Sequence, residues 1–275
     1  MSNRPTLFTG RLTRGDVLLL LLDEAGDNVQ AQYDVVEVDI YSGEHKRPSF
    51  LRDVNPAGLV PVLQLPGGEL LTETYAIALY MCREHQELRH LAPAAAHHRH
   101  NALMSWLFFL ASELEPCMKR FYYPGRFVTG GDVGVGVGVA AQPQLEATKE
   151  LARRDGMRKL ALANQRIGSG GRAPAAAGSF ALGSRQPSLV DVFLAYWVVW
   201  FSGPALAGVG ARLRGCVEAT VAWGAMRPRF EAMRAQRAEF ERLVNGGGGG
   251  GGGANKDVRD GADGEDRERG GISRL

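Results

Sequence analysis

The sequence lacks the features that mark several large classes of protein. Its cysteines are odd in number and widely spaced, which argues against a disulfide framework and for a reducing compartment: Cys82, Cys117 and Cys216. Its longest purely aliphatic run, Val17 to Leu22, is far too short to span a bilayer, and its charged neighbours suit a buried helix. The formal net charge is only +2. We therefore expect neither a membrane nor a nucleic acid as partner.

Glycine, in contrast, is concentrated in a few places. It recurs between residues 130 and 138 and between 168 and 178, and it is unbroken from Gly246 to Gly253. Such stretches cannot bury enough surface to offset the entropy lost on ordering. We predict low-complexity inserts near residues 128–142 and 168–179, and a disordered tail over 246–275. The G-x-G pattern at Gly134 lacks the preceding apolar strand of a dinucleotide site, so we interpret it as part of an insert.

The first 88 residues alternate between strand and helix patterns. Leu7-Phe8 suits a short strand, residues 16–25 a helix that ends at Gly26, and residues 33–40 a strand with apolar residues at every second position. Turn residues then separate two short strands between Val60 and Leu71, and a helix follows from Glu73 to about His85. The order βαβ followed by ββα predicts a thioredoxin-like α/β domain over residues 1–88.

No strand pattern recurs after Pro93. Apolar residues at helical spacing predict helices over residues 101–123, 145–167, 188–201 and 217–240, the last bent at Pro228. Ser188 and Asp191 precede an apolar run with the spacing of a capping box, which indicates a folding role for both. The sequence thus predicts an all-helical second domain over residues 94–245.

The segment from His45 to Tyr80 is the most informative for function. Pro61 lies at the first residue of a predicted strand and has no N–H, so the backbone beside it at Val60 is left free to bond a ligand. Glu73 and Thr74 lie where a strand gives way to a helix N-terminus, whose exposed N–H groups favour a carboxylate. A strand edge beside such a helix end suits a small acidic peptide.

These residues resemble the N-terminal domain of glutathione transferases. The run from Asn55 to Leu63 is similar to the family's N-P-x-G-x-V-P-x-L segment, which ends in a cis-proline, and Gly43 to Lys46 is similar to the G-E-H-K run of the plant phi class. The Glu73-Thr74 pair follows in the family's order. The resemblance implies a thioredoxin-like domain followed by a helical domain, glutathione as co-substrate, no metal, and a homodimer.

The resemblance also assigns roles to residues that bind glutathione. Val60, next to Pro61, would exchange backbone hydrogen bonds with the cysteinyl residue, in the manner of an added strand. Basic side chains would hold the glycyl carboxylate, and an acid with a hydroxyl the γ-glutamyl end: His45, Lys46, Glu73 and Thr74. The chain departs from the family pattern at Thr74, where Ser is usual, and at Leu59, where many relatives carry Gln.

At the position where glutathione transferases place their catalytic Tyr, Ser or Cys, this chain differs from the usual pattern. No Tyr or Cys occurs before residue 33, which argues against the family's tyrosine and cysteine classes, and Thr13 falls about where phi- and theta-like members place Ser. A threonine hydroxyl can donate to a thiolate, and Arg14 would add positive charge. The alternative is that Thr13 only caps the following helix. For the electrophile site we name Trp106 and Tyr122, although aromatic residues at such spacing are more often core.

Two readings of function follow. The first is conjugation of glutathione to a small hydrophobic electrophile, or its thiol-dependent reduction; the alternative is a non-catalytic ligand-binding or protein-interaction module of the same fold. The histidines at 97, 98 and 100 have no Cys or acid at ligand spacing, so we predict no metal site. No charged-then-apolar leader precedes Leu7, and Ser273-Arg274-Leu275 match a peroxisomal address, so we expect a cytoplasmic or peroxisomal location.

Overall fold

The computed structural model describes residues 3–128, 142–167, 180–202 and 208–246. Residues 1–238 form one compact unit, and a second begins at Glu239. The predicted inserts and tail, with Ser273-Arg274-Leu275, lie outside the described residues apart from their edges. Those predictions, and the predicted domain boundaries, remain predictions.

A four-stranded mixed sheet organises the N-terminal part of the first unit. The strands are β1 (Thr6–Thr9), β2 (Asp34–Glu37), β3 (Val62–Gln64) and β4 (Leu70–Leu71). Their order is β2-β1-β3-β4, with β1 and β2 parallel and the other two pairs antiparallel. This is the predicted βαβ unit followed by a hairpin, which makes the domain thioredoxin-like.

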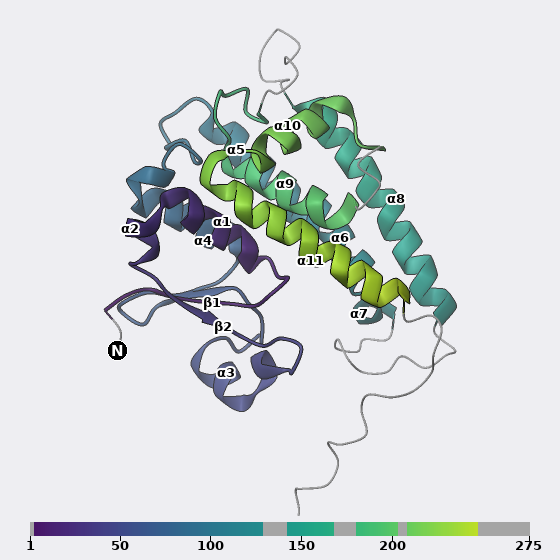
Figure 1. Cartoon of the computed structure of the whole chain (residues 1–275), viewed down its shortest axis with the longest axis horizontal. Helices are drawn as coiled ribbons and strands as arrows, with labels where there is room; N and C mark the ends of the chain where they lie inside the picture. The colour runs from purple at the N-terminus through teal and green to yellow at the C-terminus, as the bar shows by residue number, and fades with distance from the viewer. Residues whose placement is uncertain (1–2, 129–141, 168–179, 203–207, 247–275) are drawn as a thin grey trace, which may run out of the picture. The chain divides into compact units, whose positions relative to one another are not determined.

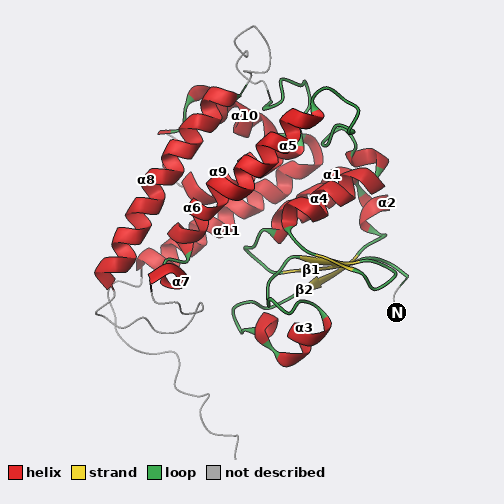
Figure 2. Ribbon diagram, turned by 180° about the vertical axis from the view of Figure 1, so that it is seen from behind, coloured by secondary structure: helices red, strands yellow, loops and turns green. Residues whose placement is uncertain are grey.

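Helices cover both faces of this sheet (Figures 1 and 2). Helices α1 (Gly15–Ala25) and α4 (Thr74–Glu84) lie on one face, and α3 (Pro48–Asp53) lies beyond the other. The short α2 (Asp27–Gln30) and the 3₁₀ turns η1 (Glu44–Lys46) and η2 (Gln86–Leu88) complete this part. The aliphatic run of α1 packs in the main core. In the described part of the chain, no helix is long and apolar enough to cross a membrane.

A small apolar cluster lies beneath the sheet. It is built from Val38, Phe50 and Val60, with Ile40 packed against it. The predicted strand 33–40 is shorter than expected, and Val36 is 41% exposed although Val38 is buried. The reason is that β2 is an edge strand, and the cluster covers the chain only beyond the C-terminal end of β2. This cluster holds the side chain of Val60.

The remaining described helices form the second part of the first unit. They are α5 (His100–Phe109), the π-helical turn η3 (Leu110–Leu114), α6 (Glu115–Tyr122), α7 (Gly125–Val128), α8 (Gln142–Arg166), α9 (Leu189–Ser202), α10 (Ala211–Val221), the 3₁₀ turn η6 (Gly224–Met226) and α11 (Arg227–Gly246), which runs on into the second unit. Every residue of α9 up to Trp200 is buried, and α9 contacts α1, α5, α6 and α10. A helix that is apolar on all sides is a core helix.

Two predicted helices are interrupted. The helix over 101–123 contains a π turn, because Pro116 has no N–H for the regular ladder and its ring crowds the carbonyl one turn earlier. The helix over 217–240 is wrong as a single element: it is α10 and α11, separated by η6. Pro228 does not bend a helix but lies in the first turn of α11, where a missing N–H costs nothing.

The predicted capping box opens α9. The Asp191 carboxylate accepts hydrogen bonds from the Ser188 N–H at 2.7 Å and from the Ser188 hydroxyl at 2.6 Å. It also accepts from the Ala181 N–H at 2.6 Å and the Cys216 thiol at 2.9 Å. Burial raises the pKa of Asp191, while these four donors favour its charged form. The predicted capping-box contact between Ser188 and Asp191 is confirmed.

Candidate functional site

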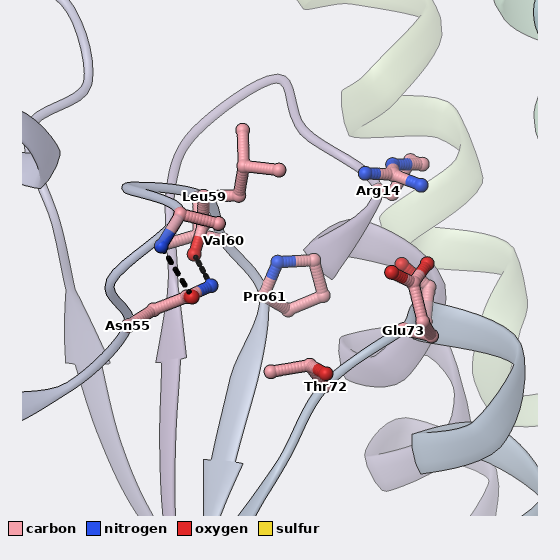
Figure 3. A pocket seen from close by; sticks show the side chains of 9 residues that line it. Arg14, Asn55, Leu59, Val60, Pro61, Thr72 and Glu73 are labelled. Atoms are coloured by element: carbon pink, nitrogen blue, oxygen red, sulfur yellow. Dashed lines mark hydrogen bonds between the residues drawn. The ribbon is translucent and has the colours of Figure 1, made fainter.

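A pocket opens where the loop before β3 faces the start of α4 (Figure 3). It encloses about 360 Å³ of space that is open to solvent. Three separate segments of the sequence supply its lining: Arg14, Asn55, Ala57, Leu59, Val60, Pro61, Thr72, Glu73 and Thr74. The structure thus brings together five of the predicted site residues, from Arg14 to Thr74.

Val60 presents its backbone at this pocket. The Val60–Pro61 peptide bond is cis, as the sequence resemblance implies. Strand β3 begins only at Val62, so the sheet uses no backbone group of Val60. Within the described residues the Val60 N–H has no hydrogen-bond partner, although the residue is only 9% exposed. A buried N–H without a partner costs free energy, so it indicates a place where a ligand supplies the acceptor.

The loop before Val60 is held in place from two directions. Asn55 is buried, and its amide bonds the Ala57 N–H and the Leu59 carbonyl, the two dashed contacts of Figure 3. Gly58 has φ +59°, and a Cβ there would lie 2.9 Å from the His45 carbonyl oxygen. Turn η1, with His45 and Lys46, therefore packs directly behind the loop. Neither basic residue lines the pocket, but both lie against its wall.

Glu73 and Thr74 form the opposite wall. Glu73 is the residue before α4 and has φ +70°, a conformation that costs a side-chain-bearing residue about 1–3 kcal/mol. It is held there while its carbonyl accepts the Ile77 N–H at 3.0 Å. Thr74 is 1% exposed, and its hydroxyl has no hydrogen-bond partner among the described residues. This wall offers an acid and an unsatisfied hydroxyl at a helix N-terminus.

The loop between β1 and α1 places Thr13 and Arg14 differently. The Thr13 hydroxyl donates to the Gly10 carbonyl at 2.7 Å and accepts from the Gly15 N–H at 3.1 Å. Thr13 does not line the pocket, whereas Arg14 does. Leu12, just before them, has φ +58°, so this turn is itself strained. The hydroxyl proton of Thr13 is thereby directed at protein, and the cation of Arg14 is directed at the pocket.

Arg14 is fixed from the helical part of the unit. Its Nη1 lies 2.6 Å from Oε1 of Glu115, the first residue of α6, and the same oxygen lies 2.7 Å from Nζ of Lys119. The Glu115 side chain is 3% exposed. Two cations share one buried acid, so the cluster carries a net positive charge beside the pocket. No sequence pattern signals this contact, because the partners are 101 residues apart.

A second buried acid lies two residues beyond Arg14. Asp16 is 9% exposed, and one of its carboxylate oxygens has no hydrogen-bond partner among the described residues. Burial raises its pKa to about 7, and the nearby Glu37 adds to this rise, whereas Arg229 opposes it. The start of α1 therefore carries a carboxyl group that titrates near neutral pH.

The two aromatic residues named for the electrophile site lie elsewhere. Trp106 is buried in the helical core, beneath the guanidinium of Arg166, whose Cζ is 4.2 Å from its ring centroid. The Tyr122 hydroxyl donates to the Trp200 carbonyl. Neither lines the pocket, so the structure does not bring them together with the residues predicted to bind glutathione. In the described ranges, no three His, Cys, Asp or Glu side chains gather as a metal site would require.

Known proteins are similar in sequence to the N-terminal part. Residues 18–84 match the model of the glutathione S-transferase N-terminal domain. The probable glutathione S-transferase GSTF2 of Oryza sativa subsp. japonica is 44% identical over 66 residues, which are 24% of this chain and 28% of the rice protein. Glutathione S-transferase GstA of Escherichia coli O157:H7 is 32% identical over 92 residues, 34% of this chain and 45% of that protein. The matches thus span less than half of these relatives.

Solved structures are similar over most of the chain. A glutathione transferase homologue from Sulfitobacter with bound glutathione has a TM-score of 0.64 at 20% identity, covering 84% of this chain and 99% of its own. Ure2p in complex with glutathione has a TM-score of 0.62 at 18% identity, covering 84% of this chain and 96% of its own. At such identities the likeness shows the fold. Residues 18–84 of this chain are thus a glutathione S-transferase N-terminal domain by sequence, and the chain has the fold of the glutathione transferases.

Proposed function

We propose that this chain binds glutathione in the pocket around Val60 and transfers it to a small hydrophobic electrophile, or uses it as a reductant. One observation carries the proposal: the unpartnered Val60 N–H and the unpartnered Thr74 hydroxyl line the same pocket. Two buried polar groups without partners, facing one space, favour a polar ligand there. The glutathione bound to the Sulfitobacter homologue and to Ure2p supports the same ligand class.

Each wall suits one part of the peptide. Val60 would donate its N–H to the cysteinyl carbonyl and accept from the cysteinyl N–H, as an added strand does. Glu73 would pair with the γ-glutamyl ammonium, and Thr74 with the carboxylate of the same residue. His45 and Lys46, behind the loop, would attract the glycyl carboxylate by their charge. Leu59 supplies no polar contact of its own side chain.

For the chemistry we propose that Arg14 stabilises the thiolate. The thiol loses its proton to solvent, and the sulfur electron pair then forms the bond to the electrophile as the leaving group departs. A cation beside the sulfur lowers the thiol pKa by favouring the charged form. Thr13 could contribute only if its hydroxyl gave up the 2.7 Å bond to the Gly10 carbonyl. That same bond favours the second candidate, a ligand-binding member without catalysis.

Two measurements separate these functions. The chain is first tested for retention on immobilised glutathione, with elution by free glutathione. Turnover of a chlorodinitrobenzene-type substrate is then measured by absorbance. Retention with turnover supports the enzyme, and retention without turnover supports the binding module. A chain that is not retained and shows no saturable binding by calorimetry contradicts both.

We also propose a two-fold homodimer, as the resemblance to glutathione transferases favours. Light scattering at micromolar concentration tests this directly. A mass near 29.7 kDa, that of one chain, would contradict it.

A further inference from the structure

Asn55 is a polar residue that the proposed chemistry does not use, yet it is only 7% exposed at the edge of the pocket. Its side-chain Oδ1 accepts from the Ala57 N–H at 3.0 Å, and its Nδ2 donates to the Leu59 carbonyl at 2.9 Å. Its own N–H donates to the Phe50 carbonyl at 2.9 Å, and its carbonyl accepts from the Gly58 N–H at 2.8 Å. Four hydrogen bonds thus tie one residue to α3 and to the loop before Val60.

The hydrogen bond from Asn55 to the Leu59 carbonyl also sets the direction of the next N–H group, that of Val60. The Leu59 carbonyl and the Val60 N–H belong to the same peptide unit, which is trans, since the cis bond follows Val60. In a trans peptide the carbonyl and the N–H point in opposite directions. Because Asn55 holds the Leu59 carbonyl toward itself, the Val60 N–H must point away from Asn55. In Figure 3, Arg14 and Glu73 lie on the other side of Pro61 from Asn55.

Among the residues that the structure describes, no other hydrogen bond holds this peptide unit in its orientation. Strand β3 begins two residues later, and the apolar cluster with Val38 and Phe50 fixes only the Val60 side chain. Leu59 is 41% exposed, so packing of its side chain does not restrain the plane. The Asn55 amide is therefore the contact that decides which way the Val60 N–H points.

We propose that Asn55 is a positioning residue for glutathione binding: its amide orients the Leu59–Val60 peptide so that the Val60 N–H meets the cysteinyl carbonyl. This inference rests on the proposed function, because it concerns the same pocket. It adds a residue whose amide acts through the Leu59–Val60 peptide, so that main-chain recognition of the ligand depends on a side chain five residues upstream of Val60.

The test uses two variants that keep one Asn55 bond and lose the other. In Asn55→Asp and in Asn55→Ser, the side-chain oxygen still accepts from the Ala57 N–H. Short polar side chains commonly accept from the backbone N–H of the residue two positions later. Neither provides a donor for the Leu59 carbonyl at neutral pH; the serine is too short, and the aspartate repels it. Thr220→Ala is the matched control. It removes a buried hydroxyl that donates to the Cys216 carbonyl at 2.8 Å on α10, which does not line the pocket.

Glutathione affinity is measured by calorimetry, and hydrogen–deuterium exchange follows the segment around Val60 with and without glutathione. We expect both Asn55 variants to bind about tenfold more weakly, the loss of roughly one hydrogen bond. Turnover at saturating glutathione should change little. Protection of the Val60 segment on binding should appear in the wild type and in Thr220→Ala and be absent from the Asn55 variants.

The outcomes separate this inference from the function beneath it. If the wild type binds glutathione and either folded Asn55 variant binds equally well with the same protection, the positioning role is wrong and the proposed function stands. A wild type that does not bind glutathione overturns the proposed function and this inference with it. Thermal unfolding of each variant identifies the folded ones, and the serine variant serves if the aspartate variant does not fold.

Discussion

Arg14 and Glu115 form an ion pair at 2.6 Å between the turn that precedes α1 and the first residue of α6. The contact joins the thioredoxin-like part to the helical part directly beside the pocket. Its acid is buried, and a buried acid that loses one cationic partner is left poorly compensated. The position of Arg14 is thus set by the helical part of the unit rather than by its own loop.

This pair predicts that Arg14 matters more for the thiol than Thr13. Arg14→Gln should raise the apparent pKa of bound glutathione and lower turnover at neutral pH, because a cation that favours the thiolate is removed. Thr13→Ala should cost about 1 kcal/mol of stability through loss of its two backbone contacts, with a smaller effect on the thiol. Thiolate absorbance as a function of pH measures the pKa of bound glutathione in both variants.

Thr13→Ser is the control for this comparison, because it keeps the hydroxyl. If Thr13→Ala shifts the thiol pKa as far as Arg14→Gln does, and Thr13→Ser restores it, the hydroxyl activates the thiol and Arg14 does not.

Glu73→Gln should weaken glutathione binding by about 2 kcal/mol, the lower end of what truncating a desolvated charged pair costs, because Glu73 is exposed until a ligand covers it. The fold should be unaffected, since the Glu73 side chain makes no hydrogen bond within the described residues. Titration calorimetry gives the affinity. Unchanged binding would place the γ-glutamyl group elsewhere.

Asp16→Asn should stabilise the protein at pH 8 by about 1–3 kcal/mol and have little effect at pH 4. An acid whose pKa rises from 3.8 to about 7 on folding is protonated in the native state over a range where the unfolded chain has released its proton. Stability is therefore lost as pH rises through that range. The groups that interact electrostatically with this carboxyl are Glu37, Tyr41, Tyr196 and Arg229.

Urea unfolding at pH 4, 6 and 8 measures this effect. Asp27→Asn, in the exposed first turn of α2, is the control for removal of a charge. An Asp16→Asn variant that is less stable than the wild type at pH 8 would mean that the carboxylate is a required partner of Arg229.

His90 should also make the protein less stable as pH rises, by a smaller amount than Asp16. Its Nε2 lies 3.3 Å from Oε1 of Glu24, which also accepts the Trp223 indole N–H at 3.0 Å, and the proximity of this carboxylate raises the His90 pKa. A raised histidine pKa adds stability that is fully present below pH 6.5 and is lost as pH rises through the folded value. The effect should be at most about 1 kcal/mol, since the pair is partly exposed.

Thermal unfolding of His90→Gln between pH 5.5 and 8.5 tests this. Glutamine keeps a polar side chain but does not titrate, so its stability should vary less with pH in this window than that of the wild type. Equal pH slopes would show that His90 does not change its charge on the native protein in this range.

The parts of the site that lie on one short segment could be predicted from sequence. Val60, Pro61, Glu73 and Thr74 are close along the chain, and Pro and helix-start residues impose their geometry locally. The same holds for the capping box of Ser188 and Asp191, where the spacing alone fixes the contact.

The parts of the site that depend on packing between distant segments could not be predicted from the sequence. Glu115 meets Arg14 only because the first residue of α6 lies beside the turn that precedes α1, and no local pattern encodes that contact. The sequence leaves Thr13 open between activating a thiol and capping a helix, because the side-chain rotamer decides where the hydroxyl proton points. In the structure the hydroxyl donates to the Gly10 carbonyl. The sequence also does not separate α10 from α11, because Pro228 is equally compatible with a bend and with a first helical turn.

The left-handed backbone of Glu73 has a consequence for engineering. Glycine adopts such a conformation without strain, although it loses more entropy on folding, so Glu73→Gly should change stability little. It would nevertheless delete the only acid of the described pocket. A library of this protein sorted for thermal resistance or expression alone would retain that substitution without penalty. Its survivors would fold as well as the parent and no longer recognise an ammonium group.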